Sequence, residues 1–101
     1  MVVEWTPVDD ACETVFATVV GERAGISATA IGFGIAATFQ RSAGTPPTMQ
    51  GSVTYLWSHE ISPASNDASF VISGNKVQVV CTGDAVNSYS WRVIACRTLG
   101  V

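Results

Sequence analysis

Apolar and polar residues alternate with a period of two along much of the chain. That period predicts β-strands that bury one face. The alternation is strongest around segment 33–41, where one row of side chains is large and apolar and the other row is small. The large row is Ile31, Phe33, Ile35, Ala37 and Phe39, and the small row is Gly32, Gly34, Ala36, Thr38 and Gln40. Small side chains on one face allow another backbone or sheet to approach closely.

Three further segments alternate in the same way. In each segment alternate residues share one face. These faces are formed by Val15, Ala17 and Val19 in 13–20, and by Val53, Tyr55 and Trp57 in 52–58. In 89–98 the face is formed by Tyr89, Trp91, Val93 and Ala95, and Leu99 continues it. Arg97 interrupts the last of these faces. Shorter strands are expected at 26–31, 68–73 and 76–82, with loops or turns at 21–25, 42–51, 59–67 and 83–88.

The pair Gly74–Asn75 separates two of the expected strands. A two-residue hairpin loop needs a positive φ in its first central residue or in both, and Gly and Asn adopt that conformation most readily. We therefore expect a β-hairpin over 68–82.

Six or seven short strands with a turn every 8 to 12 residues predict an all-β fold, an antiparallel β-sandwich or flattened barrel. Leu occurs only twice and Lys only once, and these residues are what surface helices are made from. The chain of 101 residues is long enough for one ordinary domain and one core.

Charge is unevenly distributed along the chain. The first 22 residues hold five acids and no base, so we expect an acidic N-terminal arm over 1–12 and a single β-sandwich domain over 13–101. The arm either docks onto a neighbouring subunit or frays into solvent.

Only 13% of the residues are charged, and the formal net charge is −3. A charge of this sign and size argues against nucleic-acid binding, which needs clustered Lys and Arg. The longest apolar stretch, 24–40, is uncharged, but it contains three glycines and alternates, so we expect no membrane-spanning helix. The N-terminus has no basic region before an apolar run, so we expect no signal peptide. A neutral surface is tolerated best when partners cover it.

Residues that carry catalytic or metal chemistry are sparse. Cys12, Cys81 and Cys96 are widely spaced and His59 is the only histidine, so we expect no metal site and no cofactor. The cysteines are either three reduced thiols or one disulfide and one thiol. Ser58, His59 and Glu60 cannot form a relay with one another, because neighbours on a strand point to opposite faces. We expect the adjacent acids at 9–10 to be solvated and the protein not to be an enzyme.

Aromatic residues offer one candidate binding surface. Tyr55, Trp57 and Trp91 form either a platform that stacks on a sugar or core anchors of two strands. Arg92, beside Trp91, is expected on the other face of its strand, in a paired or interface position.

Five stretches of the chain together resemble a recurring module of tailed-bacteriophage virion proteins that ends in a V-x-V-x-x-T-G-x-A…W-R hairpin. The resemblance covers 33–98, and the first 30 residues match it only loosely. Gly74, Asn75, Gly83, Trp91 and Arg92 match the shared pattern, which implies turn and hairpin roles, while Val80 and the cysteines depart from it. The matching stretches are Ala37–Arg41, Gln50–Thr54, Val71–Val79, Cys81–Ala85 and Ser90–Val93.

This resemblance implies a non-enzymatic structural protein of the virion, folded in the host cytoplasm before assembly. A chain of this length lacks the shaft of a fibre, so the first hypothesis is a capsid decoration (cement) protein. It would act as a homotrimer that binds the major capsid protein and stabilises the head. The alternative is a tail fibre, spike or baseplate component that recognises a host surface glycan, with Tyr55 and Trp57 as the contact residues. A free carbohydrate-binding module is a third class.

Overall fold

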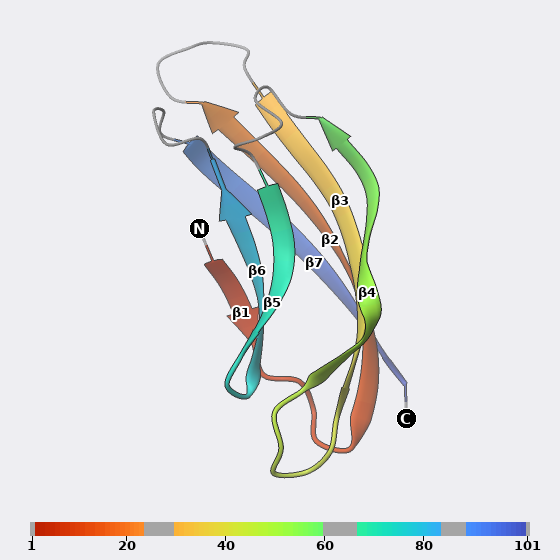
Figure 1. Cartoon of the computed structure of the whole chain (residues 1–101). Coiled ribbons are helices and arrows are strands. Elements are labelled where there is room, and N and C mark those ends of the chain that lie inside the picture. The colour runs from red at the N-terminus through yellow and green to blue at the C-terminus, as the bar shows by residue number, and fades with distance from the viewer. Residues whose placement is uncertain (1, 24–29, 60–66, 84–88, 101) are drawn as a thin grey trace.

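The computed structural model describes residues 2–23, 30–59, 67–83 and 89–100. In these residues the backbone forms seven β-strands and no helix (Figure 1). The strands are β1 (Val2–Trp5), β2 (Ala11–Arg23), β3 (Ala30–Arg41), β4 (Thr48–His59), β5 (Asp67–Ser73), β6 (Lys76–Thr82) and β7 (Tyr89–Gly100).

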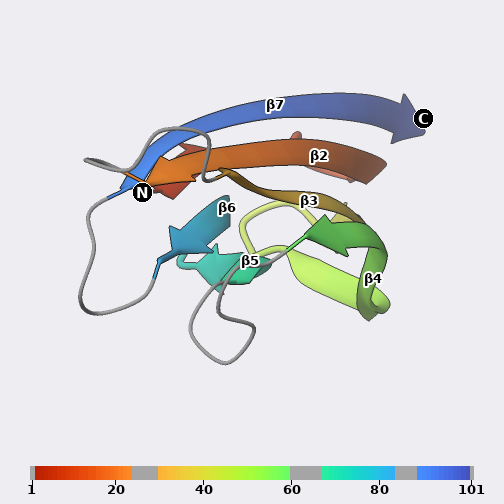
Figure 2. The ribbon, with the colours of Figure 1, turned by 90° about the horizontal axis from the view of Figure 1, so that it is seen from above.

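The strands form two antiparallel sheets that pack face to face (Figure 2). The smaller sheet has the order β1-β6-β5, and the larger sheet has the order β4-β3-β2-β7. This arrangement confirms the prediction of an all-β, antiparallel, sandwich-like fold. The larger sheet is built from strands of 12 or 13 residues, whereas those of the smaller sheet have 4 to 7.

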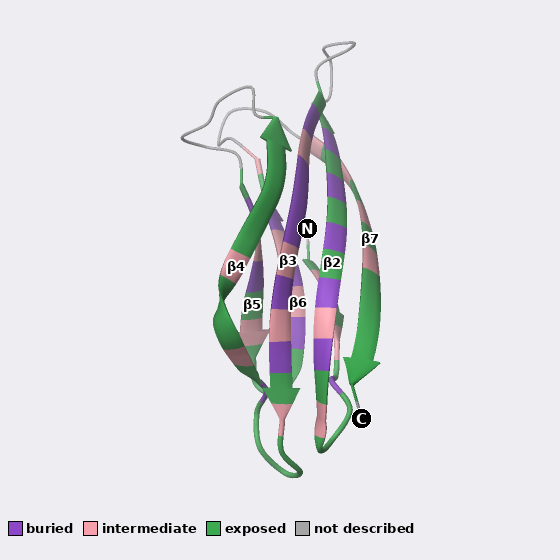
Figure 3. Cartoon of the chain, turned by 90° about the vertical axis from the view of Figure 1, so that its right-hand side faces the viewer, coloured by how far each residue is buried: buried purple, intermediate pink, exposed green. Residues whose placement is uncertain are grey.

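The core lies between the sheets and is supplied by alternate residues of each strand. The prediction for β3 is confirmed, because every member of its large apolar row is buried (Figure 3). Val15, Ala17 and Val19 of β2, which were predicted to share a face, are buried as well. Phe70 of β5 meets Phe39 edge to face at 5.5 Å between ring centroids, and so joins the two layers. The other core residues of the smaller sheet are Ala68, Val77, Val79 and Cys81.

The hairpin between β5 and β6 has the predicted turn at Gly74–Asn75. Gly74 has a φ of 59°, and Asn75 does not have a positive φ. A positive φ at the first central residue alone is the pattern of a type II′ turn, whose twist matches that of the flanking strands.

β2 continues through the first part of the predicted turn at 21–25. Gly21 pairs with Trp91 of β7, and a Cβ atom on Gly21 would lie 2.7 Å from Cζ3 of that indole. The glycine therefore makes room for a ring on the neighbouring strand, and the turn prediction at this residue was wrong. Residues 24–25, most of the predicted strand 26–31 and most of the loops 59–67 and 83–88 lie outside the described residues.

β4 begins at Thr48, so the predicted loop 42–51 is four residues too long. Gln40 pairs with Thr48 and Thr38 with Gln50, and the ladder then shifts register before Ala36. Gly51, with a φ of 78°, lies in this irregular stretch. The strand therefore continues across a bulge that has the local sequence of a loop.

β1 lies inside the segment predicted to be an acidic arm. Its backbone pairs with β6 from Val2↔Val80 to Trp5↔Val77. Glu4 accepts hydrogen bonds from Gln78 and from Lys76, and these bonds hold the pKa of its carboxyl below the ordinary value of 4.5. Residues 2–5 are therefore a strand of the smaller sheet. Val2 and Val3 are adjacent apolar residues, so this segment does not alternate and the pattern did not predict a strand.

A buried carboxylate connects the two sheets. Glu13 of β2 is 3% exposed, and its Oε1 accepts a 2.6 Å hydrogen bond from the indole N–H of Trp5. Its Oε2 accepts bonds of 3.0 and 2.7 Å from Nε and Nη2 of Arg97. The Arg97 guanidinium also lies 5.4 Å from the centre of the Trp5 ring. The charge that interrupts the apolar face of β7 is thus paired and links β1, β2 and β7.

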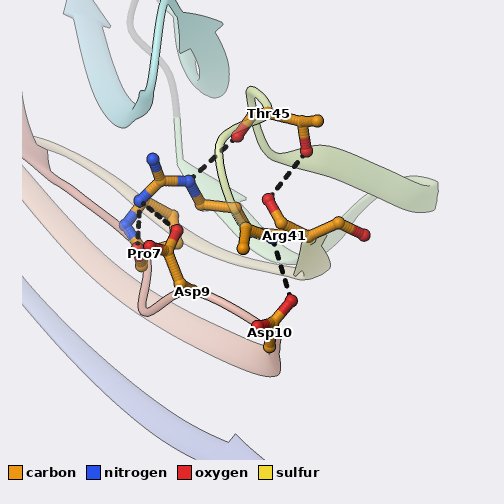
Figure 4. Close-up of polar contacts among 7 residues, drawn as sticks. Pro7, Asp9, Asp10, Arg41 and Thr45 are labelled. Carbon is orange, nitrogen blue, oxygen red and sulfur yellow. Dashed lines mark hydrogen bonds and ion pairs between the residues drawn. The ribbon is translucent and has the colours of Figure 1, made fainter.

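A second polar cluster holds two loops together at one end of the sandwich (Figure 4). Arg41 donates to the carbonyls of Pro7 at 2.8 Å and Thr45 at 3.0 Å, and it lies 3.2 Å from a carboxylate oxygen of Asp9. Asp10, with a φ of 56°, accepts a hydrogen bond from the Ala43 amide. The two adjacent acids therefore have structural partners, although they remain close to solvent.

We predict that Arg97→Met lowers the free energy of unfolding by about 3 kcal/mol, because it leaves the Glu13 carboxylate buried without its charge partner. Adding Glu13→Gln removes that buried charge, so the double variant should regain part of the loss. Urea unfolding monitored by tryptophan fluorescence measures both values. A loss below about 0.5 kcal/mol in the single variant, the size of an ordinary surface change, would show that the pair does not hold the sheets together.

Candidate functional site

The larger sheet has an inner face toward the smaller sheet and an outer face toward solvent. Figure 3 looks onto this outer face, with β4 and β7 at its two margins. Because paired residues of antiparallel strands lie on the same side, the register assigns each residue to a face. Besides the small row of β3, the outer face contains Cys12, Thr14, Phe16, Thr18, Val20 and Glu22 of β2 and Ser90, Arg92, Ile94, Cys96 and Thr98 of β7.

Large apolar side chains stand exposed on this face. Phe16 is 49% exposed, Val20 48%, Trp57 50% and Ile94 69%. These side chains are close together across the sheet. Thr18, between Phe16 and Val20, pairs with Ile94 on one side and with Gly34 on the other, and Gly34 pairs with Trp57. Grouped apolar side chains of this kind mark interaction surfaces in soluble proteins, whereas scattered ones do not.

Charge is nearly absent from the outer face. Among the described residues that the register places there, only Glu22 and Arg92 are charged, and both lie toward one end. Other charges lie elsewhere. Glu13 and Arg97 face inward, Asp9, Asp10 and Arg41 belong to the loop cluster, and Glu4, Asp67 and Lys76 belong to the smaller sheet. Depletion of charge with enrichment of aromatic residues is the composition of a protein–protein interface core.

Two shallow hollows open on this face. One, of about 330 Å³, is lined mainly by hydroxyl, amide and small side chains, among them Thr14, Thr38 and Gln50. Thr14 and Thr38 hydrogen-bond to each other across it at 2.9 Å between their oxygens. The other, of about 430 Å³, lies between Val20, Glu22 and Arg92.

Tyr55 and Trp57 do not share a face, so the prediction that Val53, Tyr55 and Trp57 point the same way was wrong. A bulge separates the pairs Gly34↔Trp57 and Ile35↔Tyr55 and gives β4 one extra residue, Leu56. Tyr55 donates from its hydroxyl to the Ala68 carbonyl at 2.8 Å and so points toward β5. Trp57 lies on the outer face, against the Cα of Gly34. The two rings therefore do not form a joint platform.

The residues that carried the resemblance lie in separate places. Gly74 and Asn75 form the β5–β6 turn, and Gly83 lies beneath the ring of Tyr89. Trp91 points inward, stacks on Tyr89 at 5.5 Å between ring centroids and packs against the core. Arg92 points outward beside Val20. Four of these residues thus act in turns or in packing, and Arg92 lies on the outer face. The five residues do not form one site.

The three cysteines differ in their surroundings. Cys12 and Cys96 are exposed on the outer face, whereas Cys81 is buried in the core. Burial raises the pKa of the Cys81 thiol, because the thiolate is poorly solvated there. Only Cys81 therefore serves as a small apolar residue of the core.

The described residues contain no group of three or more side chains able to hold a metal ion. His59 ends β4 on the outer face, opposite Gly32, while Ser58 pairs with Phe33 on the inner side. Glu60 lies outside the described residues. Within residues 2–23, 30–59, 67–83 and 89–100, no helix is long and apolar enough to cross a membrane.

Comparison with protein-family models, curated proteins and solved structures finds no match to this chain. The candidate site therefore depends on the geometry alone. It is the outer face of the larger sheet, which sequence analysis identified only in its small-residue row on β3. The exposed Phe16, Val20 and Ile94 were missed, although they stand in the otherwise polar rows of β2 and β7.

We predict that Phe16→Ala changes the free energy of unfolding by less than about 1 kcal/mol, whereas Phe39→Ala lowers it by about 3–5 kcal/mol. Both variants delete the same ring, but Phe39 is fully buried and Phe16 is half exposed. Urea titrations of the two proteins provide the comparison. An equal loss in both would mean that the outer ring serves the fold rather than an interaction.

Proposed function

We propose that this chain is a non-enzymatic structural subunit that works inside a larger protein assembly and uses the outer face of the larger sheet as its contact surface. The observation that carries the proposal is the group of exposed apolar side chains on a face that is almost free of charge. In water, four half-exposed large side chains on one face are unfavourable. Burial against another protein surface removes that cost.

The resemblance to tailed-bacteriophage virion proteins gives this assembly a specific form. The first candidate is a capsid decoration protein that binds the major capsid protein as a homotrimer and is located in the virion. Binding of many copies to the assembled head, and not to its dissociated subunits, stabilises the head by mass action. A broad neutral face suits this role, because it covers neutral seams between other subunits.

The alternative is a tail fibre, spike or baseplate component that recognises a surface glycan. Its main sequence support was an aromatic platform of Tyr55 and Trp57. Since these rings lie on opposite sides of β4, Trp57 alone remains for sugar stacking on the outer face. This geometry favours the decoration role.

We predict that the purified protein is oligomeric at micromolar concentration, with three copies expected from the resemblance. Size-exclusion chromatography with light scattering measures the mass, and a single species of 10.6 kDa would contradict the proposal. The stoichiometry in purified virions of the phage that encodes the protein then separates the two roles. Hundreds of copies favour head decoration, and a handful favours a fibre or baseplate.

Variants on the two sheets test which face makes the contact. Phe16→Glu should be lost from the assembly, because it places a charge at the centre of the outer face. Val71→Glu is the matched control, since Val71 is 43% exposed on β5 of the smaller sheet. Loss of the control variant alone would place the contact on the other side of the molecule.

A further inference from the structure

Two sheets have four edge strands, and three of them have features that hinder pairing with another chain. β1 has only four residues, and on β5 the Ala68 carbonyl already accepts a hydrogen bond from the Tyr55 hydroxyl of β4. β4 is interrupted by two register shifts and carries Gly51 at a positive φ. Short length and bulges are the devices by which natural sheets protect their edges.

β7 has none of these features. It is 12 residues long, and its register with β2 is unbroken from Cys12↔Gly100 to Arg23↔Tyr89. Its sequence contains no Pro and no Lys. In the described part of the chain β2 is the only strand paired with it, so no other described strand covers the second edge of β7 (Figure 2). A long, regular and open edge is a template for another strand.

β7 carries two charged residues, Arg92 and Arg97, and the inward-pointing Arg97 would ordinarily discourage pairing. An inward-pointing charged residue protects an edge when a second strand would bury that charge. Arg97 points inward, but its guanidinium is already bound to Glu13 and packed on Trp5. It therefore brings little unpaired charge to an incoming strand.

We propose that β7 pairs antiparallel with β7 of a second copy of this chain and joins two four-stranded sheets into one continuous sheet. The inference rests on the proposed role as a subunit of a larger assembly and replaces the trimer that the resemblance implies. It assigns the contact between copies to this edge and leaves the outer face for the other partner. We assign the partner strand to a second copy, because two β7 strands can pair antiparallel about their centre without bringing like charges face to face.

Among the described residues Ile94 is the most exposed large apolar side chain, and it lies at the middle of β7. With the two-fold axis at Ile94 or Ala95, each Ile94 packs beside Ile94 or Cys96 of the second copy, and the exposed apolar rows of the two outer faces become continuous. In either register Arg92 and Arg97 of one strand face uncharged residues of the other. Like charges directly opposite each other would destabilise the pair.

This contact is isologous, so by itself it closes at two copies. It therefore predicts a dimer or a multiple of two, whereas the resemblance implied a trimer. The mass of the oligomer distinguishes these arrangements directly.

Amide hydrogen exchange, measured residue by residue by NMR at low and high protein concentration, tests the edge contact. In an unpaired edge strand only alternate amides are bonded to the neighbour, so slow and fast exchange alternate along β7. We expect slow exchange at every amide from 92 to 97 in the oligomer and alternation on dilution. An oligomer in which alternation persists overturns the edge contact and leaves the proposed function standing. A monomer at all concentrations overturns both.

A pair of lysine variants provides a second test. Ile94→Lys places two ammonium groups near the seam, and we expect it to raise the dissociation constant of the oligomer at least tenfold while the melting temperature of the dilute protomer is unchanged. Val20→Lys is the control, since Val20 is 48% exposed on the same face but one strand away from the edge. Dissociation by Val20→Lys and not by Ile94→Lys would place the contact on the face and overturn the edge contact.

Discussion

A β-sheet has two faces, and the described strands of this chain cover only one face of its larger sheet. The four long strands bury one row of side chains against β1, β5 and β6, and that row contains most of the large apolar residues. The opposite row has no covering layer among the described residues. This open face has few charges and carries exposed rings from β2 and β4. Its composition is typical of a protein–protein interface rather than of a solvated surface.

The buried Glu13 keeps the two layers in one alignment. Its carboxylate is bonded at once by an indole from the smaller sheet and a guanidinium from the edge of the larger sheet. Apolar contacts are non-directional and fix the relative position of two sheets only loosely. A buried carboxylate is stable only where its charge and hydrogen-bond partners are in place. The same group pairs with Arg97 and so reduces the unpaired charge at the β7 edge (Figure 2). One interaction therefore links the stability of the sandwich to the availability of its edge.

Sequence alternation was enough to predict the fold class, the buried row of β3 and the β5–β6 hairpin, since each depends on local pattern. It failed where a distant residue decides the local structure. Gly21 resembled a turn residue until Trp91 was placed above it, and nothing near Leu56 marks the bulge that turns Tyr55 and Trp57 apart. The open face was predictable in part: apolar Phe16 and Ile94 stand in polar rows, but only the register shows that they are neighbours.

The central claim is that protein covers the outer face of the larger sheet when the chain is at work. Hydroxyl-radical footprinting of the isolated protein and of its native assembly tests it most directly. We expect Phe16, Trp57 and Ile94 to lose reactivity toward hydroxyl radicals in the assembly, while Val71, on the smaller sheet, keeps its reactivity. Unchanged reactivity at the first three residues, or protection of Val71 alone, would contradict it.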